Sequence, residues 1–171
     1  MKLYVKEKMV SLKGEFTVQD ELENDKYYIK GEFPSISKKF HIYDKNHNEI
    51  AFVKENLLSL IGKYEVYIKK ELVTVIKVQS KMKVERLYLE NLNWKVEGNL
   101  RSRAYKVIDE LNTEIFKVSK TWFSWGDSYE IDVMNTENEI VGLAIVLVID
   151  CILDSKDTTG GSIKHTIKIG K

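Results

Sequence analysis

The stretch EIVGLAIVLVIDCIL (residues 139–153) contains ten consecutive apolar or small residues, from 140 to 149. As a helix the whole stretch would be about 22 Å long, but a bilayer core is about 30 Å thick and needs roughly 20 apolar residues. Asp150 also interrupts the run, so we expect no transmembrane helix. Two interpretations remain. The β-branched residues favour a buried strand, whereas apolarity on every side, without alternation, is what a helix enclosed by protein requires.

Period-two alternation dominates the rest of the chain, with β-branched and aromatic residues enriched, which indicates strands. The alternating segments are EFTVQD, KYYIKGEF, KFHIYD, EIAFVK, KYEVYI, LVTVIKV, AYKVID, EIFKVSK and YEIDV. Polar clusters separate them as predicted turns: DELEND, DKNHNE, KKE, DELNTE and NTENE. No window before residue 139 shows convincing helical periodicity. The pattern is typical of an all-β protein built from consecutive hairpins.

The hairpins are related to one another by an internal repeat. The serines at positions 11, 35, 59 and 124 are each followed after five residues by an aromatic residue and after seven by a β-branched one. These residues are Phe16, Phe40, Tyr64 and Tyr129, and Val18, Ile42, Val66 and Ile131. Consecutive hairpins hide their edges completely only by closing into a barrel. About a dozen strands would leave a bore that needs a plug, a ligand or water, and the apolar segment, as a helix, would supply the plug.

Composition restricts the partners and the compartment. The 171 residues fit one domain, and 27 Lys+Arg against 26 Asp+Glu leave a net charge of +1. A nucleic-acid-binding domain is usually clearly basic, so nucleic acid is not an expected partner. The single cysteine, Cys151, excludes an intrachain disulfide and suits a reducing compartment. The N-terminal MKLYVKEKMV lacks the apolar core of a secretory signal. We therefore expect a cytoplasmic protein.

Several segments resemble a known family. SKTWFSWGDSYEIDV (residues 119–133), followed by an apolar run ending in Asp, resembles the LURP-one-related proteins, which belong with the phospholipid scramblases to the tubby C-terminal-like superfamily. The N-terminal YVKEKMVSLKGEFTVQDELEND, KENLLSLIGKYEVY and NWKVEGN are similar to segments of bacterial members. The resemblance covers about residues 2–155, and its tryptophan segment is the most specific part.

The resemblance implies a fold and leaves the activity open. It implies an all-β domain with one buried helix: a tubby-like closed antiparallel β-barrel of about twelve strands around a hydrophobic C-terminal helix. The expected domain covers residues 1–155 with the helix near 140–153, and the polar tail 156–171 is either an extra edge strand or mobile. Tubby-like domains bind phosphoinositides through basic side chains, but no position matches residue by residue. Scramblases carry a cysteine cluster and a proline-rich region, whereas this chain has one Cys and one Pro.

Basic clusters are the best candidates for a binding site. Lys81, Lys83 and Arg86 in SKMKVERLY, and Arg101 and Arg103 in RSRAYK, place several cations close together. A cation near an anionic lipid surface gains about 1 kcal/mol, so two clusters on one face would give weak, salt-sensitive membrane association. The ordinary interpretation of such clusters, and of the Lys38–Lys39 and Lys69–Lys70 pairs, is a solvated face.

Nothing in the sequence has the pattern of a catalytic or metal site. His41, His47 and His165 lack metal-ligand spacing, and Cys151 lies in the apolar segment, where a small buried hydrophobe is usual. Asp150 is costly there unless it lies at the barrel mouth or meets a basic partner.

We therefore expect a non-enzymatic binding or scaffold module, without cofactor or metal, whose partners are anionic phospholipid headgroups or a protein. It would be cytoplasmic or peripheral at the membrane. The alternatives are a carrier of an apolar ligand and an unrecognised enzyme. The enzyme and carrier alternatives need an accessible cavity with convergent polar groups, whereas a binding module needs only surface cations and a filled bore.

Overall fold

The computed structural model describes residues 1–6, 15–32, 37–59, 62–81, 84–123 and 126–161, with side chains described except at 6, 79–86, 122–128 and 154–161. The strands are β1 (Lys2–Lys6), β2 (Glu15–Gln19), β3 (Asp25–Gly31), β4 (Lys39–Asp44), β5 (Glu49–Glu55), β6 (Lys63–Ile68), β7 (Glu71–Lys81), β8 (Val84–Glu90), β9 (Trp94–Asn99), β10 (Ala104–Ile108), β11 (Glu114–Phe123) and β12 (Gly126–Val133). A 3₁₀ turn, η1 (Thr136–Asn138), leads into the helix α1 (Glu139–Gly161).

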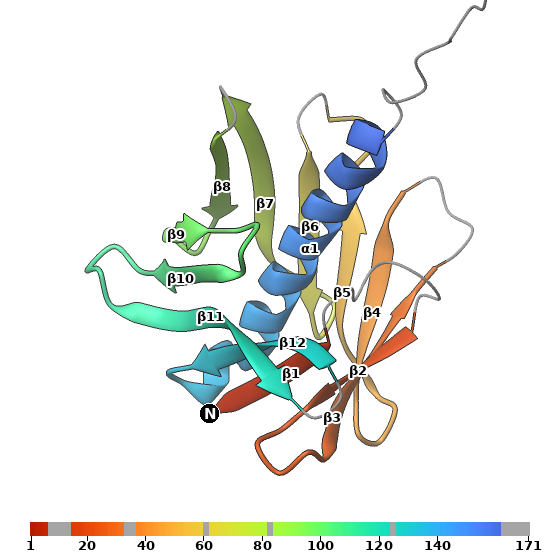
Figure 1. The fold of residues 1–171 in the computed structure, drawn as a ribbon. Coiled ribbons are helices and arrows are strands. Elements are labelled where there is room, and N and C mark those ends of the chain that lie inside the picture. The colour runs from red at the N-terminus through yellow and green to blue at the C-terminus, as the bar shows by residue number, and fades with distance from the viewer. Residues whose placement is uncertain (7–14, 33–36, 60–61, 82–83, 124–125, 162–171) are drawn as a thin grey trace, which may run out of the picture.

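The twelve strands form a closed barrel in which each strand pairs with its sequence neighbours, and β12 closes onto β1 (Figure 1). Every pairing is antiparallel, and Leu3 of β1 lies opposite Ile131 of β12 at the closure. The predicted barrel is thereby confirmed. All nine segments predicted as strands fall on strands, and β1, β8 and β9 complete the barrel.

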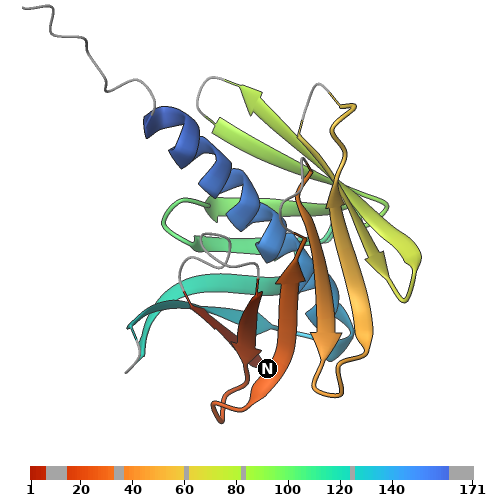
Figure 2. The same ribbon diagram turned by 90° about the vertical axis from the view of Figure 1, so that its right-hand side faces the viewer.

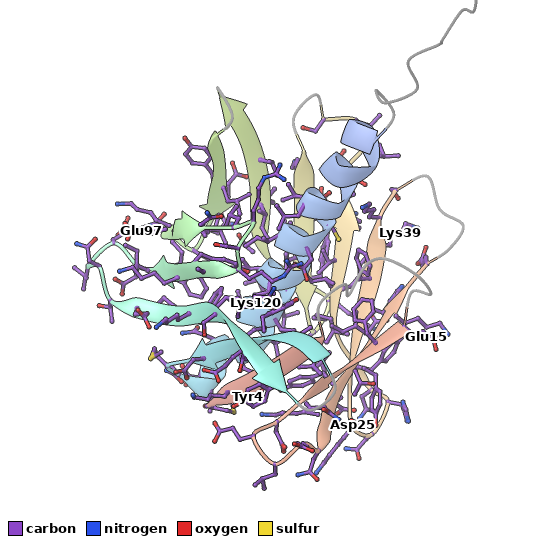
Figure 3. All side chains as sticks on the ribbon, viewed as in Figure 1. Tyr4, Glu15, Asp25, Lys39, Glu97 and Lys120 are labelled. Atoms are coloured by element: carbon purple, nitrogen blue, oxygen red, sulfur yellow. The ribbon has the colours of Figure 1, made fainter. Side chains whose placement is uncertain are left out.

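The helix α1 runs through the barrel from one end to the other (Figures 1 and 2). Residues 141–153 are all buried, so the apolar run contacts protein on every side. This confirms the enclosed helix and excludes the buried strand. The repeat residues meet it from the barrel wall, since Ile42, Val66 and Ile131 are fully buried on β4, β6 and β12. Charged side chains labelled in Figure 3, such as Glu15 and Glu97, lie on the outside.

The helix is longer than the apolar run. The predicted helix ends at Leu153. The observed helix continues for eight more residues and ends at Gly161. Ser, Lys, Asp and Thr can continue a helix outside the core, because apolarity marks burial and not the helix end. Glycine is the residue that commonly ends a helix, and the Gly160–Gly161 pair supplies that signal. The rest of the expected tail, 162–171, lies outside the described residues.

A membrane-crossing role for the helix was not expected from its length. No helix within the described ranges is long and apolar enough to cross a membrane.

We call the barrel end where α1 begins the proximal end and the opposite end the distal end. In an antiparallel barrel the connections alternate between the two ends. The β5–β6, β7–β8 and β9–β10 connections therefore lie at the distal end, and the β2–β3, β4–β5, β6–β7 and β10–β11 turns at the proximal end.

Three of the proximal turns have the same construction. The Oδ1 atom of an aspartate accepts hydrogen bonds from the backbone N–H groups two and four residues later, at 2.8–3.0 Å. These aspartates are Asp20, Asp44 and Asp109. The residue three positions after each has a positive φ of 61–62°. The carboxylate accepts hydrogen bonds from N–H groups that have no strand partner in the turn, and it thereby stabilises the tight turn.

Candidate functional site

Asp150, on the part of α1 inside the barrel, is a buried polar residue that two other segments of the chain contact. Its side chain is 4% exposed. The hydroxyl of Tyr129, on β12, donates a hydrogen bond to Oδ2 at 2.5 Å. Nη2 of Arg103, immediately before β10, donates to Oδ1 at 3.0 Å. The predicted basic partner of Asp150 is therefore confirmed, and it is Arg103.

Packing and charge reinforce this cluster. The Arg103 guanidinium lies 5.2 Å from the centroid of the Tyr129 ring, a distance at which a cation is attracted to a ring face. Burial, and next the charge of Asp150, raise the pKa of Tyr129 and of the nearby Tyr105 well above the usual value. Both phenols therefore stay protonated at neutral pH. Chemically the cluster is a hydrogen-bonded ion pair that fixes α1 against β10 and β12.

A second set of contacts joins α1 to the β3–β4 side of the barrel. Nζ of Lys38 donates to the backbone oxygen of Cys151 at 3.2 Å, and the Lys38 N–H donates to Glu55 Oε2 at 3.1 Å. The Tyr64 hydroxyl lies 3.5 Å from the other oxygen of Glu55. Burial is the main cause that raises the pKa of Tyr64. Cys151 itself is fully buried, as its place in the apolar run predicts.

Of the predicted basic residues, the two in RSRAYK differ in the direction of their side chains. Arg103 has a side chain only 15% exposed and points inward to Asp150, whereas Arg101 is exposed in the β9–β10 connection. Lys81 lies at the end of β7 and Arg86 in β8. Their side chains and the whole of Lys83 lie outside the described residues.

The sequence contains a signal for the inward position of Arg103. It lies in the turn before β10 and precedes the buried Tyr105 by two residues, so the period-two pattern of β10, continued back by one position, points its side chain inward. This spacing from an inward-facing aromatic residue is the feature that separates Arg103 from the surface cations.

Two exposed leucines at the distal end escaped the sequence analysis. Leu57 and Leu58, in the β5–β6 connection, are 52% and 96% exposed. The Asn56 side chain accepts a hydrogen bond from the N–H of Leu58 at 3.1 Å, which holds the turn that presents them. The signal was the apolar pair in ENLLS, at a place where a polar turn is expected.

The described histidines have protein partners. His41 contacts Glu49 through Nδ1 at 2.8 Å and Glu32 through Nε2 at 3.1 Å. His47 stacks on Tyr28 with ring centroids 5.1 Å apart. Within the described ranges no three His, Cys, Asp or Glu side chains gather as metal ligands. His165 lies outside these ranges.

Comparisons with known proteins identify a family, a partial sequence relative and a protein of similar fold. A family model described as LURP-one-related matches residues 1–150. An uncharacterized Bacillus subtilis protein, YxjI, is 35% identical over 65 residues, which are 38% of this chain and 40% of that protein. The match thus spans well under half of that relative's length. The X-ray structure of an Arabidopsis thaliana protein is similar with a TM-score of 0.61 at 14% identity, covering 88% of this chain and 90% of that one.

Proposed function

We propose that this chain, which belongs to the LURP-one-related family, is a non-enzymatic binding module that associates with anionic phospholipid headgroups at the distal end of its barrel. The observation that carries this proposal is the exposed pair Leu57 and Leu58, at the same end of the barrel as the exposed Arg101 in the β9–β10 connection. Apolar side chains at the same end as a cation suit a membrane surface, which offers acyl chains below a layer of anionic headgroups.

The filled bore favours a surface site over an interior one. A carrier of an apolar ligand needs an accessible cavity, whereas buried side chains of α1 occupy the barrel from residue 141 to 153. An enzyme needs a nucleophile or base within reach of a substrate. The convergent polar groups around Asp150 are instead committed to one another in the core.

Weak and salt-sensitive binding is expected from the contributing groups. The candidate cations are Arg101 and the three that the sequence places in SKMKVERLY, namely Lys81, Lys83 and Arg86. Each contributes about 1 kcal/mol near an anionic surface, and this attraction falls off over a Debye length of about 8 Å at physiological salt. The anionic cytoplasmic leaflet would supply such a surface to a cytoplasmic protein.

The test is co-sedimentation with phosphatidylcholine vesicles, with and without phosphatidylserine. We expect the full chain to sediment only with the anionic vesicles and to be released by salt. Leu58→Ser should weaken binding several-fold because it removes apolar area that enters the interface. Arg101→Gln should weaken it about fivefold, the equivalent of about 1 kcal/mol.

The matched control is Leu111→Ser, because Leu111 is 85% exposed in the β10–β11 turn at the proximal end. It should bind vesicles as the unaltered chain does. Equal losses for the Leu58 and Leu111 variants, or equal binding to neutral and anionic vesicles, would rule out the distal lipid site.

A further inference from the structure

An open groove of about 580 Å³ lies on the outer face of β5 and β6. Phe52 of β5 and Tyr67 of β6 line it and face each other in the strand register. Their ring centroids are 6.2 Å apart with 35° between the ring planes. The groove thus has an aromatic lining and a volume within the range of small-molecule sites.

The charges around the groove are predominantly positive. Lys54, Lys69 and Lys70 line it together with one carboxylate, Glu49. Glu49 is already paired with His41. The ammonium of Lys54 is paired with Glu65 at 3.0 Å and lies 5.3 Å from the centroid of the Tyr67 ring.

Lys69 and Lys70 differ from Lys54, which is paired with the carboxylate of Glu65. Both are exposed, and in the described part of the chain neither forms an ion pair. They supply two uncompensated cations at one side of the groove, next to the aromatic rings. An anion bound there would not have to displace a protein carboxylate.

The backbone at these lysines is conformationally costly. Lys69 and Lys70 form the β6–β7 turn with φ of 49° and 70°. Turns with two consecutive positive φ values favour Asn-Gly, because a Cβ atom is disfavoured in this region, glycine has none, and Asn tolerates the conformation better than most residues. Residues in such conformations cluster at functional sites, so the lysines here motivate a search for a ligand.

We propose that the groove binds a small phosphorylated ligand with an aromatic ring, of the nucleoside monophosphate class. The phosphate would contact the ammonium groups of Lys69 and Lys70 through charge-assisted hydrogen bonds. The ring would pack against Phe52 and Tyr67, since aromatic pairs gain beyond the area they bury. This site is at the β6–β7 side of the barrel and does not depend on the distal lipid site.

The test is calorimetric titration of the full chain with adenosine monophosphate, and separately with adenosine and with ribose 5-phosphate. We expect the nucleotide to bind at least tenfold more tightly than either part, because only the nucleotide engages both the lysines and the rings. Chemical-shift changes should centre on the β5 strand and the β6–β7 turn. Phe52→Leu should weaken the binding of the nucleotide and leave the binding of ribose 5-phosphate unchanged.

The decisive variant is Lys69→Asn with Lys70→Gly. It should raise the thermal midpoint, because Asn-Gly suits this turn, and weaken nucleotide binding at least tenfold. A gain in stability together with a loss of binding cannot arise from misfolding. The charge-matched control is Lys95→Gln with Lys117→Gln, two exposed lysines on β9 and β11, and it should bind normally.

Three results would overturn the proposal. They are an absence of nucleotide binding, unchanged binding by the Asn-Gly variant, and ribose 5-phosphate binding as tight as that of the nucleotide. The last would show an anion site without a role for the rings.

Discussion

At the scale of single residues, Asp150 is the costly feature of an otherwise apolar helix. A carboxylate taken out of water needs a partner and hydrogen bonds. Arg103 and Tyr129 supply both, from a turn and a strand that are adjacent to the helix only in the folded barrel. A buried ion pair is a weak source of net stability. We infer that its main effect is to fix the depth of α1 in the bore.

Replacing one member of this ion pair should lower the free energy of unfolding more than replacing both members. Asp150→Leu leaves the Arg103 guanidinium without its carboxylate, and we expect a loss of about 3–5 kcal/mol in the free energy of unfolding. Adding Arg103→Met should restore most of that loss. Urea denaturation of the two variants checks this. Tyr129→Phe removes only one hydrogen bond, so its loss in the free energy of unfolding should be smaller than that of Asp150→Leu. Additive losses in the double variant would contradict the prediction.

At the scale of elements, the proximal aspartate turns set the register of consecutive hairpins. Hydrogen bonds from Asn24 lower the pKa of Asp20, and those from Asn48 lower the pKa of Asp44, below the usual 3.8. An aspartate with a lowered folded pKa stabilises the fold above its unfolded pKa. This contribution is lost as the pH falls through the folded pKa.

The variant Asp20→Asn with Asp44→Asn should therefore change the acid response. The amide oxygens can still accept the backbone hydrogen bonds, but they do not titrate. We expect the unaltered chain to be the more stable at pH about 6, with the difference shrinking towards pH about 3. Urea midpoints across this range measure it.

The charge-matched control for the aspartate variant is Glu23→Gln with Glu110→Gln, both exposed. It should keep the acid response of the unaltered chain. A constant difference between the aspartate variant and the unaltered chain at every pH would mean that the two aspartates do not contribute through ionisation.

At the scale of the whole molecule, the helix is the core on which the hairpins close. The inward side chains of nearly all strands contact one another or α1 in a single apolar cluster. Without α1 they would line an empty bore. Exposing each large side chain costs about 1.5–3 kcal/mol, while a domain's total stability is only about 5–15 kcal/mol.

The truncated chain 1–139 should accordingly fail to fold. Thermal unfolding followed by circular dichroism should show no cooperative transition. In the full chain Leu147→Asp, which buries an unpaired carboxylate at a fully buried site, should prevent soluble expression, whereas Leu111→Asp at an exposed site should not. A cooperative transition of the truncated chain near that of the full chain would show that the helix is dispensable for folding.

The sequence determined the strands and the existence of the barrel. Alternation in nine segments and the repeat from Phe40 to Tyr64 to Tyr129 reflect side chains that alternate between a packed interior and solvent, a pattern each strand carries locally. Three strands were not identified in this way. In β9, for example, apolar and charged residues alternate only from Trp94 to Glu97, and the two apolar side chains are only partly buried, so the alternating segment is short.

The tertiary structure alone decided what the apolar segment and its charges do. Ile, Val and Leu at 140–149 suit a strand as well as a helix by local preference, and only enclosure by the barrel on every side selects the helix. The same holds for Arg103. Its place in the pattern indicates an inward side chain, but a buried cation is stable only beside an anion, and Asp150 lies 47 residues away in the chain. Burial and pairing are properties of the closed barrel, because they depend on which distant segments become neighbours.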